Sequence, residues 1–208
     1  MSGEDWYRNR KWNGEIERHF MDKLKRARRK EQYLRIQAST LSAIEPEVAI
    51  SLLEYYFTLA DDFDHAQAYC DYASAYLALG KTEKALESYK AALTREIEFP
   101  KLQTDAYILY PLIIVENKLE LMYAAANDVL EEHKDRLMFP IDYFRWYAAK
   151  AIIESKIGSK ECASIHAVNA LESAQIKTSG FRFHQNQGLV GKEYQGVVNE
   201  LRAIKGSS

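Results

Sequence analysis

The stretch from residue 66 to residue 93 constrains the fold more than any other, because it contains two amphipathic helical patterns on either side of Gly80. Apolar and aromatic residues recur there at spacings of three and four, which places each set on one face of a helix. Glycine reaches the left-handed conformation that ends many helices, and Thr82 is a suitable N-cap for the next helix. The stretch therefore predicts a helical hairpin. Its two stripes are Tyr69, Tyr72, Ala73, Tyr76 and Leu77, then Ala85, Leu86, Tyr89, Ala92 and Leu93.

Residues of the same kind recur at fixed distances from this hairpin. Tyr33 precedes Tyr69 by 36 residues, and Gly158 follows Gly80 by 78 residues, which is twice 39. A period of this length is typical of solenoids, in which helical hairpins stack side by side. The chain has only 9 glycines and 4 prolines in 208 residues, which argues against a β-rich fold. The sequence therefore predicts an all-α array of about four hairpins.

Single residues place further helix boundaries. Asn13 is a suitable N-cap, and Pro46 and Pro140 are suitable first residues of a helix. Pro111 falls within an apolar helical pattern and is expected to kink it, because proline removes a backbone hydrogen bond and crowds the preceding turn. Helices are expected over residues 32–44, 102–117, 119–133 and 193–204, and the last of these would cap the open end of the array.

The hairpin at residues 66–93 resembles a tetratricopeptide repeat. That pattern has a large apolar residue, a small residue and a tyrosine along its first helix, a glycine at the turn, and an alanine, an aromatic residue and an alanine along its second helix. The matching residues here are Tyr69, Ala73, Tyr76, Gly80, Ala85, Tyr89 and Ala92. The resemblance is looser over residues 31–175. It implies a right-handed superhelix over residues 31–176, preceded by a docking segment and helix (1–30) and followed by a C-terminal cap and tail (177–208).

Tetratricopeptide proteins mostly bind other proteins, so the resemblance implies a scaffold or adaptor for a protein or peptide partner, without enzymatic activity. Their binding groove is lined by the first helix of each hairpin. Members that clamp the acidic tails of chaperones carry lysine and asparagine where this chain has Cys70 and Ser74, so that clamp is not expected. The corresponding groove residues are Leu34, Ala38, Leu41, Cys70, Ser74, Leu77, Ala148, Ile152 and Ser155.

Nucleotide-binding, catalytic and metal-binding motifs are missing from the sequence. It contains no P-loop, no GxGxxG and no GxSxG, and its five histidines lie in five different expected elements without metal-ligand spacing. The acidic run from Asp61 to Asp64 lacks the oxygen spacing and the glycine of a calcium loop, and is interpreted as an N-cap region. No metal, cofactor or catalytic residue is therefore expected.

Charge and hydropathy favour a cytoplasmic protein. The formal net charge is −2, so no global field selects nucleic acid or membrane. The N-terminus is polar, and the longest apolar run, residues 106–115, is far shorter than the roughly 20 residues that span a bilayer.

Cys70 and Cys162 lie in different expected helices and are interpreted as two buried thiols in a reducing compartment. Self-association through the open helical edge is an alternative partner arrangement.

The N-terminal 30 residues contain two features with more than one interpretation. Trp6, Tyr7 and Trp12 are expected to dock on the chain's own first helix, and a partner contact is the alternative. The basic cluster at residues Lys23–Lys30 suits a solvated helix C-terminus. Nucleic-acid binding through this cluster is the main alternative function, and an acidic protein partner is another.

The segment Phe181–His184 stands outside the hairpin pattern. Arg182 lies between two aromatic residues and is followed closely by His184, a set that can bind an anion or a peptide carboxylate. The favoured interpretation is that the segment packs against the cap, with Arg182 paired to a nearby carboxylate or carbonyl group.

Overall fold

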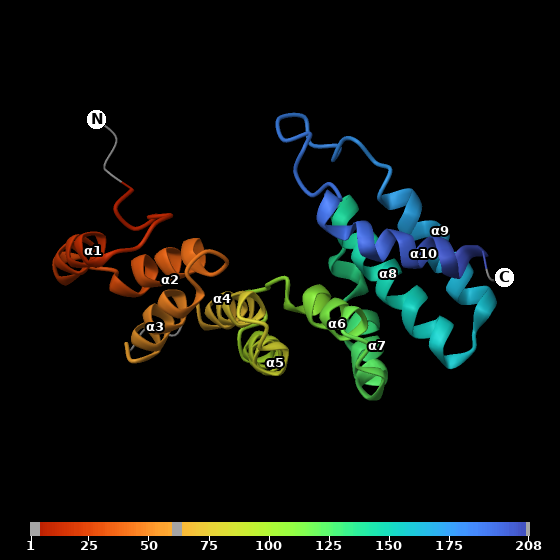
Figure 1. Cartoon of the computed structure of the whole chain (residues 1–208), viewed down its shortest axis with the longest axis horizontal. Helices are drawn as coiled ribbons and strands as arrows, with labels where there is room; N and C mark the ends of the chain where they lie inside the picture. The colour runs from red at the N-terminus through yellow and green to blue at the C-terminus, as the bar shows by residue number, and fades with distance from the viewer. Residues whose placement is uncertain (1–4, 60–63, 207–208) are drawn as a thin grey trace. The chain divides into compact units, whose positions relative to one another are not determined.

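The computed structural model describes residues 5–59 and 64–206, and the regular elements in these ranges are all helical (Figure 1). The prediction of an all-α chain is thus confirmed, whereas the right-handed superhelix stays a prediction. The helices divide into two compact units, the first ending at Ala106 and the second beginning at Tyr107. Sequence patterns did not predict this division. The boundaries predicted after residues 30 and 176 stay predictions.

The described residues of the first unit form five helices, which pack mainly against their neighbours in the chain. Helix α2 pairs with α3, α4 pairs with α5, and α3 and α2 also contact α4. Its core combines leucines with small residues, so that the helices approach closely. Buried members include Phe20, Leu24, Leu34, Leu53, Tyr56 and Ala68. The helices are α1 (Gly14–Arg26), α2 (Lys30–Leu41), α3 (Pro46–Phe57), α4 (His65–Ala78) and α5 (Thr82–Glu98).

The segment before α1 docks on the chain itself. The Trp6 ring lies 4.8 Å from the Tyr33 ring and 5.4 Å from the Phe20 ring, and Trp12 lies 5.6 Å from Phe20. Tyr7 also contacts Tyr33, at 4.8 Å between ring centroids. The expected docking of the N-terminal aromatic residues on the first helix is therefore confirmed, and it extends to α2.

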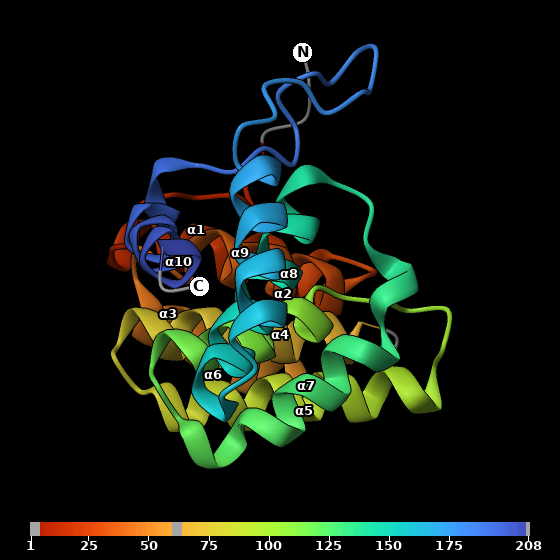
Figure 2. The ribbon, with the colours of Figure 1, turned by 90° about the vertical axis from the view of Figure 1, so that its right-hand side faces the viewer.

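The second unit is built around a long hairpin. Helix α8 pairs with α9, and α10 packs across both. The segment between α9 and α10 projects away from these three helices in both ribbon views (Figures 1 and 2). Helix α6 (Ala106–Glu116) opens the unit and is followed by η1 (Glu120–Met122), α7 (Tyr123–Glu132), η2 (Lys134–Arg136), α8 (Pro140–Ile157), α9 (Lys160–Ser173), η3 (Lys192–Tyr194) and α10 (Gln195–Gly206).

Several predicted helix ends are confirmed. Gly80 and Gly158 have φ angles of 68° and 90° at the corners between paired helices, where a side chain would be strained. The Asn13 side chain accepts hydrogen bonds from the backbone N–H groups of Glu15 and Ile16 at 3.0 and 2.9 Å. Pro46 and Pro140 are the first residues of α3 and α8.

Other predicted boundaries need correction. Thr82 is the first residue of α5 and not its N-cap, which is Lys81. Helix α6 begins at Ala106 and not at residue 102, because the buried Glu96 carboxylate instead accepts hydrogen bonds from the Thr104 backbone N–H at 2.8 Å and hydroxyl at 2.6 Å. Pro111 lies inside α6, as predicted, and the kink expected there stays a prediction.

The two cysteines have different environments. Cys70 is buried, and its Sγ lies 3.3 Å from Thr104 Oγ1. Cys162 is exposed, so the expectation that both thiols are buried is wrong for this residue. Burial raises the pKa of the Cys70 thiol to about 12, so it stays protonated at neutral pH. None of the described helices combines the length and apolar composition needed to cross a membrane.

Candidate functional site

A groove lined by three tyrosines runs along the α4/α5 hairpin of the first unit. Tyr69, Tyr72 and Tyr76 lie at i, i+3 and i+7 on α4, so they share one face of that helix. The groove encloses about 380 Å³. We call it the tyrosine groove, and its lining residues are Tyr69, Tyr72, Tyr76, Lys84, Glu87, Ser88 and Ala91.

The aromatic rings along this face form a continuous stack. The Phe57 ring lies 5.4 Å from the Tyr72 ring with their planes 4° apart, and the Tyr72 ring lies 5.7 Å from the Tyr76 ring at 12°. Phe57 also contacts Tyr69, at 4.8 Å between centroids. Offset stacking of this kind holds each ring against its neighbours and limits its rotation. The groove therefore has a wall that is rigid before any partner arrives.

Charged groups border the tyrosine groove. The Lys84 ammonium lies over the Tyr76 ring, 5.5 Å from its centroid, and Glu87 is exposed one turn further along α5. Burial raises the pKa of the Tyr72 hydroxyl, with a further contribution from the nearby Glu54 carboxylate. Tyr72 is therefore a neutral hydroxyl, able to donate and to accept a hydrogen bond.

Most residues of the groove predicted from the sequence lie in the interior. Ser74 and Leu77 are half-buried, and Ser155 is exposed. The Ser74 hydroxyl lies 3.2 Å from that of Ser42. The other six contribute to the cores of their units, and their role in partner binding stays a prediction. These six are Leu34, Ala38, Leu41, Cys70, Ala148 and Ile152.

The segment Phe181–His184 lies at the surface, where it contacts the start of α8. The Phe181 ring packs 5.2 Å from the ring of Phe139, the N-cap residue of α8, whereas the expected packing against the C-terminal cap stays a prediction. The Arg182 guanidinium lies over the exposed Phe183 ring, 5.3 Å from its centroid. Arg182 is itself exposed, so it is not enclosed together with a hydrogen-bond acceptor. The backbone carbonyl of His184 accepts a hydrogen bond from the Ser179 hydroxyl at 2.7 Å.

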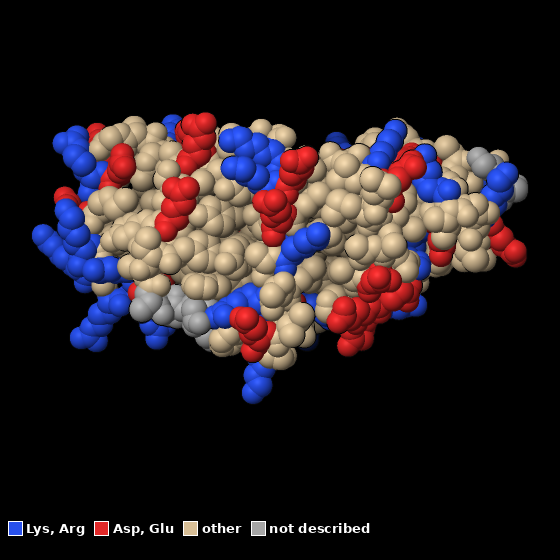
Figure 3. All heavy atoms as spheres, turned by 90° about the horizontal axis from the view of Figure 1, so that it is seen from below, with Lys and Arg blue, Asp and Glu red and all other residues tan. Residues whose placement is uncertain are grey.

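The basic cluster predicted at residues Lys23–Lys30 is solvent-facing. It covers the last turn of α1 and the connection to α2, and all its cations are exposed except Lys30, which is half-buried. Lys25 pairs with Asp22 at 3.0 Å, but both side chains are largely exposed, so this pair contributes little to stability. Lys and Arg side chains gather on the α1 side of the first unit in Figure 3.

Two buried charged clusters have clear structural roles. In the second unit, Lys150 Nζ lies 2.7 Å from Asn127 Oδ1 and 2.8 Å from Glu131 Oε1, and Glu154 Oε2 lies 2.6 Å from His166 Nδ1. This cluster links α7, α8 and α9. In the first unit, Arg35 contacts both Asp64 and Asp71 and so links α2 to α4.

Over residues 5–59 and 64–206, histidine, cysteine and carboxylate side chains do not gather in threes as a metal ion would need. Of the acidic run Asp61–Asp64, only Asp64 is described. It stands at the N-cap of α4 without a side-chain capping bond and pairs instead with Arg35 at 3.2 Å.

Comparisons with protein-family models, with curated proteins and with solved structures gave no match to this chain. Its functional interpretation therefore rests on its own residues.

The tyrosine groove was only partly foreseeable from the sequence. Helical spacing predicts that the three tyrosines share one face, but it does not show whether that face is buried between helices or lies at the surface. In the structure the three tyrosine rings are half-buried, while Ala66, Ala73 and Ala75 lie on the fully buried face of α4. Lys84 and Glu87 lie on the facing helix α5, at the rim of the same groove. These two charged residues were the sequence signal that the tyrosine face lies at the surface.

Proposed function

We propose that this chain is a non-enzymatic adaptor of the cytoplasm that binds an extended peptide segment of a partner protein in the tyrosine groove. The observation that carries this proposal is the pre-formed stack of half-buried rings along α4, with a cation and a carboxylate on the facing helix. We also propose that its hairpins are tetratricopeptide-like, which the glycine corners at Gly80 and Gly158 support.

The ring geometry favours a peptide over a stacked nucleobase. Nucleobases bind proteins by stacking on aromatic side chains, whereas Phe57, Tyr72 and Tyr76 already stack on one another, with 5.4 and 5.7 Å between ring centroids. Insertion would therefore have to separate rings that pack against each other. An extended peptide requires no such opening, because it can lie along the groove and bond to tyrosine hydroxyls through its main chain.

Selection from an unbiased peptide display library tests this proposal. We expect the wild-type chain to enrich peptides that Tyr76→Ala and Lys84→Glu variants no longer retain. Tyr55→Ala is the matched control, because Tyr55 is 40% exposed on α3 and does not line the groove. Circular dichroism establishes that each variant is folded. Failure to enrich any peptide, or equal retention by the Tyr76→Ala variant, would contradict the proposal.

A second candidate function is nucleic-acid binding through the basic cluster Lys23–Lys30. Residues 1–30 contain ten Lys and Arg against five Asp and Glu, whereas the other 178 residues contain 18 against 25. Positive charge is thus concentrated in one part of an otherwise acidic chain, as a phosphate-binding surface requires.

Gel shifts at low and high salt with single-stranded RNA and duplex DNA test this second function. A phosphate-binding site predicts affinity that falls steeply with salt and that an Arg28→Glu, Arg29→Glu double variant abolishes. Lys160→Glu, which changes an exposed cation in the second unit, should leave binding unchanged. Absence of binding at low salt would exclude this function.

A further inference from the structure

A second groove lies between α9 and α10 in the second unit. It encloses about 580 Å³ and is the larger of the two surface grooves described here. Helix α9 contributes Val168, Leu171 and Glu172, at i, i+3 and i+4, and Gln175 follows just past its end, while α10 contributes Gln195, Val198, Arg202 and Lys205. Each set follows helical spacing, so the groove runs along both helices.

The apolar part of the floor of this groove is formed by aliphatic side chains, and further aliphatic side chains lie beyond it. Val168, Leu171, Val190 and Val198 are half-buried. Along α9, Ile165 is 54% exposed one turn before Val168, and Ile176 is 45% exposed just past the helix end. A row of exposed aliphatic side chains on one helix face is the feature that a partner helix covers in hairpin packing.

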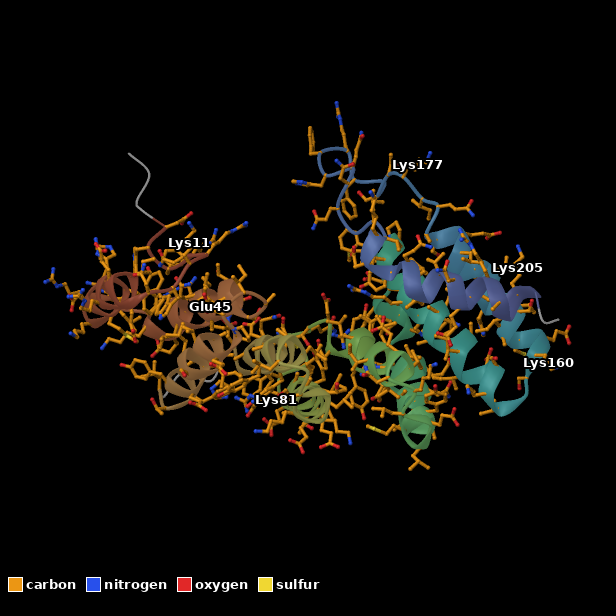
Figure 4. The ribbon with its side chains drawn as sticks, viewed as in Figure 1. Lys11, Glu45, Lys81, Lys160, Lys177 and Lys205 are labelled. Carbon is orange, nitrogen blue, oxygen red and sulfur yellow. The ribbon has the colours of Figure 1, made fainter. Side chains whose placement is uncertain are left out.

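The rim carries an excess of positive charge. Lys192, Arg202 and Lys205 are all exposed, and Glu172 is the one carboxylate among the lining residues. Lys205 lies at the C-terminal end of α10 (Figure 4), and Lys192 lies in η3 just before that helix begins. The cations therefore flank the groove at both ends of α10, which spans about 18 Å at 1.5 Å per residue.

We propose that the α9/α10 groove binds an acidic amphipathic helix of a partner protein. The apolar floor would receive the aliphatic face of that helix, and the three rim cations would pair with carboxylates on its flanks. A partner helix of about 12–14 residues matches the lengths of α10 and α9. This surface belongs to the second unit, so it is independent of the tyrosine groove.

Selection from a helix-forming display library tests this inference on the full chain. Apolar positions are fixed at i, i+3, i+4 and i+7, and the remaining positions vary among Glu, Asp, Lys, Arg, Gln and Ser. We expect the wild-type chain to enrich peptides of negative net charge. An Arg202→Glu, Lys205→Glu double variant should weaken their binding at least about tenfold, which corresponds to 1.4 kcal/mol. Both substitutions are at exposed positions, so folding is expected to persist.

Lys177→Glu is the matched control, because Lys177 is exposed in the segment between α9 and α10 and does not line the groove (Figure 4). It should leave binding within about twofold, since surface substitutions away from a site have small effects. Enrichment of neutral or basic peptides, or no enrichment, would overturn the proposal. Binding only to anionic lipid vesicles, or a concentration-dependent dimer that the double variant abolishes, would also overturn it and assign the groove to a membrane or to a second copy.

Discussion

Asn9 and Gln37 are joined by three hydrogen bonds that fix the N-terminal segment to α2. The backbone N–H and the side-chain Nδ2 of Asn9 both donate to Gln37 Oε1 at 2.9 Å, and Gln37 Nε2 donates to the Asn9 carbonyl at 2.8 Å. Gln37 is completely buried. A polar side chain in the core is tolerated because all these groups have partners, and its geometry selects one position for the segment.

We expect Gln37→Leu to destabilise the fold by roughly 2–3 kcal/mol, because it leaves the Asn9 backbone groups without partners. Urea unfolding followed by tryptophan fluorescence measures the change, and the emission of Trp6 and Trp12 should shift to the red as the segment loosens. Gln32→Leu is the matched control, since Gln32 is an exposed residue of the same helix. Equal effects of the two substitutions would contradict this prediction.

Lys150→Met should be one of the most damaging single substitutions in the second unit. Lys150 is 8% exposed and contacts Asn127, Glu131 and Glu154, so its removal leaves the half-buried Asn127 and Glu154 acceptors facing an apolar side chain. Because Glu131 is 48% exposed and stays hydrated, we expect a loss of about 1–3 kcal/mol, the cost of leaving partly buried polar groups without partners. Chemical denaturation is the measurement, with Lys160→Met as an exposed control. A loss below about 1 kcal/mol would show that the cluster does not hold α7, α8 and α9 together.

Gly188 should be far more sensitive to substitution than Gly180. Both have positive φ angles, 69° and 78°, but a Cβ at Gly188 would lie 2.5 Å from Phe139 side-chain atoms, whereas a Cβ at Gly180 meets open space. The Gly188 carbonyl also accepts a hydrogen bond from the Ile141 N–H at 2.8 Å. We expect Gly188→Ala to release the segment before α10 and to speed tryptic cleavage there. Gly180→Ala should cost only the backbone strain, about 1–2 kcal/mol. Equal cleavage rates would contradict the tight packing at Gly188.

Asp71 should make the first unit less stable as pH rises from about 4 to about 6. Burial raises its pKa from 3.8 to about 6, although the Arg35 guanidinium opposes this shift. The folded protein therefore keeps the proton over a range where the unfolded chain has lost it, and this contribution to stability is largest below pH 4. Relative to Asp71→Asn, the wild-type free energy of unfolding should fall by roughly 2 kcal/mol between pH 4 and pH 6, because Asp71 is still about half protonated in the folded state at pH 6.

Urea unfolding of the wild-type and Asp71→Asn chains at pH 4, 5, 6 and 7 measures this difference. Above about pH 7 the difference should be constant, because Asp71 is then largely ionised in both the folded and the unfolded states. A difference that stays level between pH 4 and pH 6, or that rises, would contradict the assigned environment of the Asp71 carboxyl group.

The helices and their corners followed from sequence because they depend on local chemistry. Gly80 and Gly158 end helices through a conformation that other residues adopt only with strain, and Asn13 and Pro46 begin helices through their own side chains. These effects act within one turn of the chain. They therefore need no knowledge of the tertiary fold.

The candidate site was harder to predict from the sequence. The periodicity of apolar residues shows which of them share a helix face, but not how deeply that face is buried. Tyr72 and Ala73 are neighbours in one predicted stripe, yet Ala73 is fully buried and Tyr72 lines a surface groove. Likewise, Leu34 and Ala38, which the resemblance places along a groove, are fully buried in the core of the first unit, and their role in partner binding stays a prediction. The burial of a helix face depends on which other helices pack against it. Long-range contacts such as Gly188 against Phe139 have no local signal at all.

The claim that the tyrosine groove receives a peptide is tested most directly by titration calorimetry with a display-selected peptide. Replacing Tyr76 with alanine removes the last ring of the stack, and we predict that it raises Kd at least about tenfold, while Tyr55→Ala changes Kd by less than about twofold. If the Tyr76→Ala chain binds the peptide as tightly as the wild-type chain does, the groove is not the binding site.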